Sequence, residues 1–318
     1  MEIFKRVPQI DFMGRRRVTT VFSVVLLVVS LVSLGIQGLN LGIDFTGGTL
    51  VEVGYDEAVE VNEVRGALAG TEYEDAQVIH FGSPREILVR TPPMEGVEQA
   101  AVSEAVLELL RAEREGVDLR RVEFVGPQIG RELTEQGILA MLYALGGILI
   151  YVGFRFEYRF AIGSVAALVH DVILVLGFFS LMRINFDLTV LAALLATIGY
   201  SLNDTIVVFD RIRENFLKVR KATAEEVMNL SVNQVLSRTL VTSFTTLLVV
   251  GALLVLGGEI IFGFAMALLV GVLVGTYSSI FVASASSLAL GVSKQDLMPP
   301  EKEGEDQPEQ GPLPPLDR

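Results

Sequence analysis

Six long stretches of this sequence carry almost no charged residues, and they constrain the fold more than any other feature. A helix of about 20 apolar residues crosses the roughly 30 Å hydrocarbon core of a bilayer. Inside lipid, every backbone N–H and C=O group needs a partner within the protein, so such stretches form helices. The sequence therefore predicts an α-helical polytopic membrane protein with spans at 18–39, 136–154, 160–182, 186–209, 238–258 and 260–290.

The short segments that flank these spans indicate the orientation of the chain. Residues 1–17 end in three consecutive arginines, and the apolar run that follows is longer than a signal-peptide h-region and lacks an Ala-x-Ala-like site. We therefore expect an uncleaved anchor. Further Arg and Lys residues lie between the second and third spans and in the connection 210–237, which places both termini in the cytoplasm. The tail 291–318 is rich in Pro and charge and is expected to be disordered and cytoplasmic.

The first outer connection, residues 40–135, is too long for an unstructured loop and is expected to form its own domain. Strand-like alternation and helical spacing follow one another along it in the order strand, helix, strand, strand, helix, strand. These segments are 49–54, 60–69, 76–81, 86–90, 97–115 and 119–125. The βαββαβ order predicts a small ferredoxin-like α+β domain outside the cytoplasm.

An acidic residue inside the fourth span is the strongest functional signal in the chain. Asp204 precedes the first cationic residue by about two turns, on the order of 10 Å at 1.5 Å per residue. An ionisable group at membrane depth costs several kcal/mol and usually marks an ion or proton route. Thr197, Ser201 and Asp204 fall at i, i+4 and i+7, which puts one polar stripe on an otherwise apolar helix.

The fifth span begins with a second charge, Arg238, which is followed by Thr242 at i+4. Arg238 and Asp204 lie toward the same half of adjacent antiparallel spans, so an ion pair between them is geometrically reasonable. A movement that makes or breaks this contact would change the proton affinity of the carboxylate, as a proton-coupled machine requires. The alternative is an interfacial anchor that reaches to the lipid headgroups.

The third span contributes two adjacent polar residues, His170 and Asp171, near its middle. Neighbours in sequence do not share a helical face, so at most one of them is expected in the environment of Asp204. A structural hydrogen bond to a neighbouring helix is as good an interpretation as a role in proton transfer.

The sixth span carries small residues at a strict spacing of four, a pattern that permits close helix approach in lipid. The column consists of Gly263, Ala267, Gly271, Gly275, Ser279, Ala283 and Ser287. It predicts a packing seam, within this chain or against another subunit.

Composition and missing motifs exclude several classes of function. The 25 Lys and Arg against 38 Asp and Glu give a net charge of −13, which disfavours nucleic-acid binding. Cysteine is absent, and there is no His-Glu-x-x-His zinc motif, P-loop or Gly-x-Ser-x-Gly elbow. An intramembrane aspartyl protease could use Asp171 and Asp204, but its Gly-x-Gly-Asp pattern is missing. We expect no enzymatic activity, no metal and no cofactor.

Two longer motifs resemble signatures of the SecF branch of the SecD/SecF family. The first is Gly42-Ile-Asp-Phe-Thr-Gly-Gly48, which includes Asp44 and Gly47 and is shared with SecD. The second, residues 199–215 around Asp204, is long and specific. Shorter matches lie at 169–172, 237–239 and 277–283, so the resemblance extends from the first span to the sixth. One departure is Ala285, where many relatives have proline.

The resemblance implies a six-helix half of an RND-type transporter that pairs with SecD in the bacterial cytoplasmic (inner) membrane. Such a unit assists export of unfolded preproteins, met on the extracytoplasmic side, through the SecYEG translocon after the SecA ATPase has started translocation. It uses the proton motive force, or a sodium gradient in some members. YajC and YidC are further implied partners. An alternative is a subunit of an RND-type proton-coupled exporter of small molecules or lipids, and a membrane-anchored scaffold is disfavoured by Asp204.

The family's charged proton-pathway residues match Asp204 and Arg238 by position. We expect the polar residues Ser201, Asn203 and Thr242 to line the same H⁺ or Na⁺ pathway, with His170 and Asp171 as weaker candidates.

Overall fold

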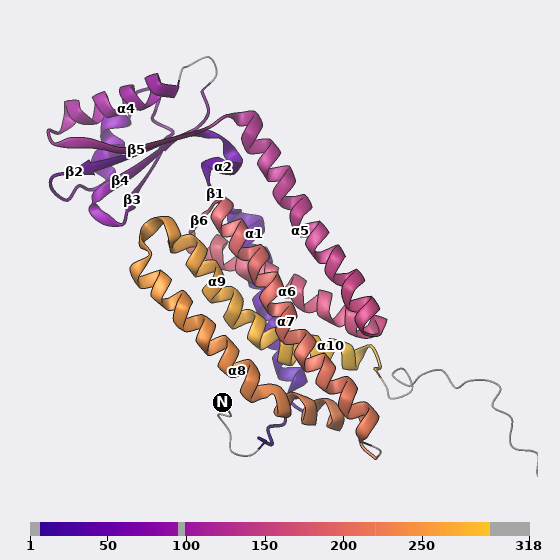
Figure 1. The fold of residues 1–318 in the computed structure, drawn as a ribbon. Helices are drawn as coiled ribbons and strands as arrows, with labels where there is room; N and C mark the ends of the chain where they lie inside the picture. Colours follow the sequence, from indigo (N-terminus) through magenta and orange to yellow (C-terminus); the bar gives the residue numbers. More distant parts are fainter. Residues whose placement is uncertain (1–6, 95–98, 220, 293–318) are drawn as a thin grey trace, which may run out of the picture.

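The computed structural model describes residues 7–94, 99–219 and 221–292. A small sheet domain lies at one end of a bundle of long helices (Figure 1). Six helices of this described part are long and apolar enough to cross a membrane, which confirms the predicted number. They are α1 (Arg16–Gln37), α5 (Pro127–Arg155), α6 (Tyr158–Met182), α7 (Leu188–Lys218), α8 (Ala224–Leu256) and α9 (Gly258–Ser278), the last continued by the π-helical turn η1 (Ser279–Ala283) and α10 (Ser284–Ala289).

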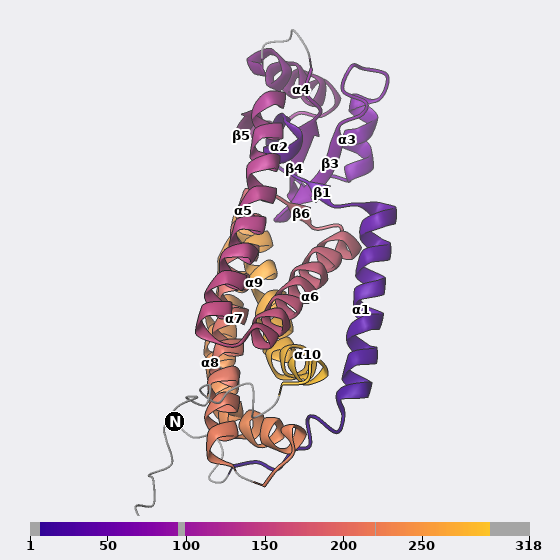
Figure 2. The ribbon, with the colours of Figure 1, turned by 90° about the vertical axis from the view of Figure 1, so that its right-hand side faces the viewer.

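The first and last described residues both lie at the end of the bundle away from the sheet domain (Figures 1 and 2). This is the arrangement that an even number of spans requires. Residues 1–6 and nearly all of the predicted disordered tail, from 293 on, lie outside the described residues.

Three helices continue beyond the spans that were predicted from apolar runs. α7 ends at Lys218 rather than at 209, and α8 begins at Ala224, so most of the predicted connection 210–237 is helical. A capping box starts α8, in which the N–H of Glu226 donates to Thr223 Oγ1 and the N–H of Thr223 donates to the Glu226 carboxylate. α5 begins at Pro127, so the outer domain ends earlier than 135. An apolar-run criterion misses these ends because they carry charge on one face.

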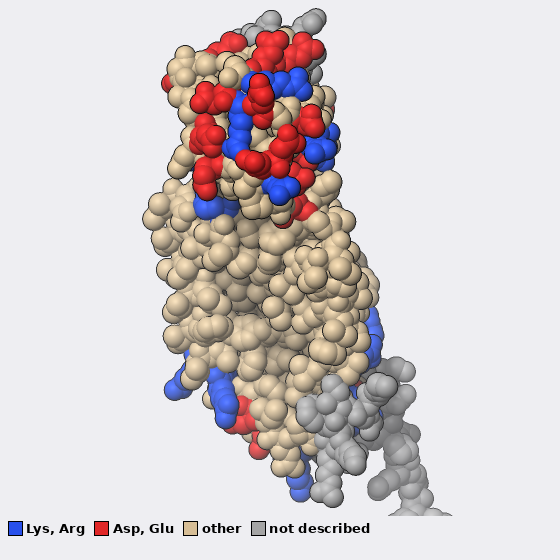
Figure 3. Space-filling view, turned by 90° about the vertical axis from the view of Figure 1, so that its left-hand side faces the viewer, with Lys and Arg blue, Asp and Glu red and all other residues tan. Residues whose placement is uncertain are grey.

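The centre of the bundle consists of α6 and α7. Half of the apolar window of each is buried, compared with 17% of the window of α1 and 11% of that of α5. On the face shown in Figure 3, a broad belt without charge lies between the charged outer domain and the scattered charged residues of the opposite end. This is the distribution that a spanning protein needs.

The small residues of α9 pack against α7 within this chain, which answers the question that the sequence left open. A Cβ on Gly275 would stand 3.0 Å from Ser201 Cβ, and one on Gly263 would stand 2.9 Å from Val190 Cγ2. A Cβ on Gly271 would overlap Thr197. Ser279 continues the column and is fully buried in η1. Only residues without bulk therefore let α9 approach the polar stripe of α7.

The outer domain has the predicted βαββαβ order and a fully antiparallel sheet in the order β3-β4-β2-β5. Its elements are β2 (Gly48–Tyr55), α3 (Val61–Leu68), β3 (Gln77–Phe81), β4 (Ser83–Thr91), α4 (Gln99–Glu113) and β5 (Val117–Val125). This strand order confirms the ferredoxin-like prediction. Val51, Val53 and Val89 lie in the core that α3 and α4 complete on one face of the sheet. Leu50 and Leu88 on the other face pack with Ile43, next to the spanning helices.

Two very short strands join the outer domain to the helices. β1 (Asn40–Leu41), which follows α1, pairs in parallel with β6 (Asn185–Phe186), which precedes α7. A single turn, α2 (Ile43–Thr46), then leads into β2. The chain entering the domain and the start of the helix that carries Asp204 are therefore hydrogen-bonded to each other.

Candidate functional site

The polar stripe of α7 lies on the buried face of that helix. Thr197, Ser201 and Asp204 are exposed by 2%, 0% and 3%, so the acid is enclosed by the bundle rather than turned to lipid. The Oδ2 atom of Asp204 has no hydrogen-bond partner among the described residues. A buried carboxylate oxygen without a donor is unfavourable, so this is the chemically least satisfied acid at membrane depth in the described part.

In the described structure, Asp204 and Arg238 do not form the ion pair that their spacing allows. Arg238 is exposed, and it lines a cavity of about 590 Å³ between α7 and α8 together with the exposed Asn203. The rotation of α8 about its axis turns Arg238 toward this cavity, whereas Asp204 faces the bundle interior.

The Thr242 hydroxyl does not turn toward Asp204 either. It donates to the backbone carbonyls of Arg238, at 3.1 Å, and Thr239, at 2.9 Å. A hydroxyl bonded to its own helix in this way cannot also donate to a carboxylate on α7. Of the expected pathway residues, Ser201 lies on the buried side, Arg238 and Asn203 line the cavity, and Thr242 is half-buried one turn after Arg238.

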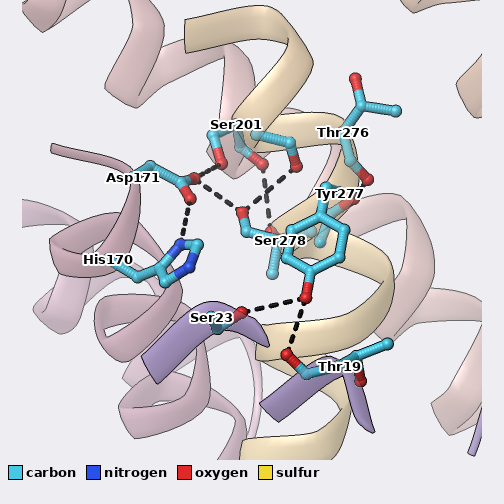
Figure 4. Close-up of polar contacts among 11 residues, drawn as sticks. Thr19, Ser23, His170, Asp171, Ser201, Thr276, Tyr277 and Ser278 are labelled. Carbon is cyan, nitrogen blue, oxygen red and sulfur yellow. Dashed lines mark hydrogen bonds and ion pairs between the residues drawn. The ribbon is translucent and has the colours of Figure 1, made fainter. Parts of the chain in front are cut away.

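The densest polar cluster in the spanning helices surrounds Asp171, which the sequence ranked lower (Figure 4). Ser201 Oγ donates to Asp171 Oδ2 at 2.6 Å, and Ser278 Oγ donates to the same oxygen at 2.7 Å. His170 Nδ1 lies 3.0 Å from Asp171 Oδ1. Both residues are buried. Asp171 therefore joins α6 to α7 and α9, and through Ser201 it lies one helical turn from Asp204.

The sequence did not predict which hydroxyls of α8 and α9 make contacts between the helices. Ser278 binds Asp171, and Ser243 lies 2.7 Å from Thr276 and accepts from the Tyr200 hydroxyl at 3.2 Å. Ser278 directly precedes the π-helical turn η1, a feature that often marks functional positions. The resemblance over 277–283 was the only sequence signal for it.

Residues of the glycine motif, 42–48, hydrogen-bond to the start of α7 and so connect the outer domain to that helix. The N–H of Gly42 donates to Phe186 O at 2.8 Å, and the Asp44 carboxylate accepts from the N–H of Leu188 at 2.9 Å. Gly47 and Gly48 have φ angles of +73° and +119°, which side chains rarely adopt. A Cβ on Gly47 would also stand 3.0 Å from Pro127 Cα. The motif therefore serves as a joint where β2, α5 and α7 meet.

A buried arginine of β4 fastens the sheet to the same joint. Arg90 donates to Leu41 O at 3.1 Å, Gln77 Oε1 at 3.0 Å and Asn185 Oδ1 at 2.8 Å. Burial lowers the pKa of its guanidinium, and the charges of Asp187 and Asp44 oppose that shift. A cavity of about 630 Å³ lies beside Arg90, lined by the outer domain on one side and by the ends of the spanning helices on the other.

Among the described residues, no three His, Cys, Asp or Glu side chains gather closely enough to hold a metal ion. The chemistry that these groups offer is the binding and release of protons and the relay of hydrogen bonds between helices.

Comparison with known proteins identifies the family. Residues 105–293 match the family described as "Protein export membrane protein SecD/SecF, C-terminal", and residues 32–59 match "SecD/SecF GG Motif". The chain is 51% identical over 306 residues to "Protein translocase subunit SecF" of Vibrio alginolyticus, covering 95% of this chain and 97% of that protein. The protein of the same name from Pseudomonas aeruginosa is 50% identical over 298 residues, covering 93% of this chain and 96% of that one.

A solved structure shares the arrangement of the chain. The crystal structure of SecDF, a translocon-associated membrane protein from Thermus thermophilus, matches with a TM-score of 0.82 at 40% sequence identity. The match covers 91% of this chain and 39% of that longer one. Family models, relatives and structure agree, and the chain belongs to the SecD/SecF family, as a SecF-type subunit of a bacterial protein translocase, a multi-pass transport protein and not an enzyme.

Proposed function

We propose that this chain pairs with a SecD protein and uses the proton motive force to assist preprotein export through the SecYEG channel of the cytoplasmic membrane. The observation that carries the proposal is Asp204, buried at membrane depth with one carboxylate oxygen that lacks a partner among the described residues. An ionisable side chain is costly to bury at that depth, and such residues usually mark ion or proton pathways. Reversible protonation of Asp204 is the coupling event.

Arg238 sets the proton affinity of that acid. When the guanidinium approaches the carboxylate, the ionised form is favoured, and when it withdraws, the protonated form is favoured. The separation between the two side chains, with Arg238 in the α7–α8 cavity, corresponds to the withdrawn state. A movement of α8 relative to α7 alternates the two states.

The coupling ion is H⁺ rather than Na⁺. A sodium ion would need several oxygen ligands around Asp204. A proton needs only the carboxylate.

SecD covers the face that carries α7 and α8. Arg238 and Asn203 are exposed there, and so are the large apolar residues Phe244, Leu248 and Val249 of α8. A second six-helix half would enclose this face and put Asp204 near the interface of the halves, as in other repeat-built transporters. YajC and YidC are further partners of the assembled complex.

The outer domain meets the unfolded preprotein on the extracytoplasmic side, and both termini are cytoplasmic. Support for this orientation comes from the cations at the end of the bundle that holds both described chain ends, among them Arg155 and Arg211. The joint formed by Asp44, Arg90 and the β1–β6 pair transmits movement of α7 to the sheet.

The test is gradient-dependent export by the chain reconstituted with SecD and SecYEG, for wild type, Asp204→Asn and Arg238→Ala. We expect both variants to assemble and to keep the SecA-driven part of export while losing the part that depends on the proton gradient. Asp210→Asn is the matched control, because Asp210 pairs with Arg155 at the helix end, at 2.9 Å, and is not buried.

Export by Asp204→Asn at the wild-type rate would reduce Asp204 to a structural contact and contradict the proposal. Replacing sodium by potassium on both sides should leave export unchanged. A loss of export on that replacement would assign the coupling to sodium.

A further inference from the structure

His170 lies at the inner end of a cavity that the proton-coupling proposal does not use. The cavity has a volume of about 330 Å³ and lies between α1, α6 and the segment from Tyr277 to Ala289. Thr19, in the first turn of α1, and Ala289, the last residue of α10, line it. α1 begins and α10 ends toward the end of the bundle that lies away from the sheet domain (Figures 1 and 2). It therefore extends from that end of the bundle toward the middle of α6.

Only one of the two ring nitrogens of His170 has a hydrogen-bond partner among the described residues. Nδ1 is bonded to Asp171 Oδ1 at 3.0 Å, whereas Nε2 is buried and has no hydrogen-bond partner among the described residues. The whole side chain is 3% exposed, and it lines the cavity. A carboxylate that accepts from one ring nitrogen fixes the tautomer and leaves the other nitrogen free to take a proton.

The other groups around His170 can hold water in the cavity. The Tyr277 hydroxyl lies 3.0 Å from Ser23 Oγ and donates to Thr19 O at 2.9 Å, and its ring centre lies 6.3 Å from that of His170 (Figure 4). The volume is about ten times the roughly 30 Å³ that a water molecule occupies in the liquid, and a buried water needs two to four polar partners. Hydroxyls, a carbonyl and an imidazole supply them.

We propose that His170 is a second protonatable site of this chain, loaded by water in the α1–α6–α10 cavity. A hydronium ion in the cavity gives one proton to Nε2 and is left as water, and the resulting imidazolium is stabilised by the Asp171 carboxylate. Asp171 and Tyr277 are the titratable side chains that face His170 within the described part, and the described residues of α1 and α10 that line the cavity are all uncharged. Because Asp171 is bonded to Ser201, this site connects the cavity to the helix turn that carries Asp204.

This inference rests on the proposed proton coupling, but its first test does not require transport. The chain has no cysteine, so single cysteines can be introduced into the native sequence. Ser23→Cys lies in the cavity, and Val25→Cys, at nearly the same depth on α1, replaces a side chain that is 53% exposed on the lipid-facing side. Both full-length variants are treated in membrane vesicles with a charged, membrane-impermeant methanethiosulfonate.

Thiols react as thiolates, which form in water and not in hydrocarbon. We therefore expect Ser23→Cys to react at least about tenfold faster than Val25→Cys when the reagent is added on the side of the membrane that holds the chain ends. Ser286→Cys, which lines the cavity from α10, should behave like Ser23→Cys and guards against a local effect of one variant. Reaction of both cavity cysteines only with a lipid-soluble maleimide would show that a lipid chain fills the space and would overturn the proposal.

The second test compares His170→Gln with Asp204→Asn in gradient-driven export. Glutamine keeps an N–H for Asp171 but cannot take up a proton. We therefore expect gradient-driven export to fall, and we expect the export rate to vary less with pH between about pH 5 and 8. A wild-type pH profile for His170→Gln, with Asp204→Asn inactive, would overturn the role of His170 and leave the proposed function intact. Full activity of Asp204→Asn would instead overturn the proposed function. The labelling experiment would still decide whether water fills the cavity, because it does not depend on export.

Discussion

The carboxylate of Asp44, in the helical turn α2 that leads into the outer domain, accepts a hydrogen bond from the backbone N–H of Leu188 at 2.9 Å. Asp187 accepts from the N–H of Val190 at the same helix end, also at 2.9 Å. The first turn of α7 is therefore capped by one carboxylate of its own and by one that belongs to a distant part of the chain. Asp44 holds the two parts together because the exposed N–H groups of a helix start attract anionic oxygens.

Removal of this cap should weaken the chain measurably. We expect Asp44→Ala to lower the free energy of unfolding by about 1 kcal/mol, and Asp44→Asn to lower it by less, because an amide oxygen still accepts. Thermal unfolding of the purified chain in detergent measures the effect. Asp75→Ala, a change at an exposed acid of the same domain, is the control. Equal midpoints for Asp44→Ala and the control would show that the cap contributes nothing.

Arg90 should control how tightly the sheet is held to the helices. Its three side-chain hydrogen bonds to Leu41, Gln77 and Asn185 are lost in Arg90→Met, and hydrogen bonds to a charged group contribute about 1.5–3 kcal/mol. We expect faster amide hydrogen exchange at β1 and β6, with little change in the strands of the sheet. Arg85→Gln, at an exposed position of the same strand, should exchange like wild type. Unchanged exchange at β1 in Arg90→Met would contradict the assignment.

The outer domain should lose stability at alkaline pH through Tyr55. Burial, with the nearby Glu63 charge, raises the pKa of Tyr55 to about 12, and Arg114 opposes the shift. A phenol whose folded pKa lies above its unfolded value near 10 binds more protons in the folded state, so stability is full below pH ~10 and falls as the pH rises toward ~12. The loss should amount to roughly 2 kcal/mol.

Tyr55→Phe has no such phenol, so its stability should change less over the same pH range. The measurement is the difference in unfolding midpoint between wild type and Tyr55→Phe as a function of pH. A constant difference across that range would refute the shift, whatever the other tyrosines do.

Close contact between α7 and α9 should make one glycine intolerant of even a methyl group. A Cβ on Gly271 would overlap Thr197, so we expect Gly271→Ala to destabilise the chain by about 1–3 kcal/mol, as overpacking of a tight core does. Gly251→Ala on α8 meets nothing within 4 Å and should be neutral or slightly stabilising. The measurement is the thermal unfolding midpoint of both variants in detergent, each compared with wild type. Equal midpoints would mean that the helices can separate at no cost.

The sequence predicted what local patterns encode. Uncharged runs identified the six helices, alternation gave the βαββαβ order, and Asp204 was visible because one acid in an apolar run stands out. The rotation of α8 was not predictable, since spacing places Arg238 at the depth of Asp204 but does not decide which way the side chain points. The Ser278–Asp171 contact was not predictable either. Hydroxyls in membrane helices usually bond to their own backbone, as Thr276 does to Val272 O at 2.7 Å, and only packing shows which one reaches further.

The parallel pair of β1 and β6 has a consequence for the order in which the protein is built. β1 leaves the ribosome with the first spanning helix, but its partner strand follows the third, after the whole outer domain and α5 have been synthesised. The hydrogen-bonding edge of β1 therefore has no partner until the α6–α7 connection has been synthesised. Docking of the outer domain is a late step of biogenesis, and truncated chains that end before Asn185 should carry an outer domain that is folded but not seated.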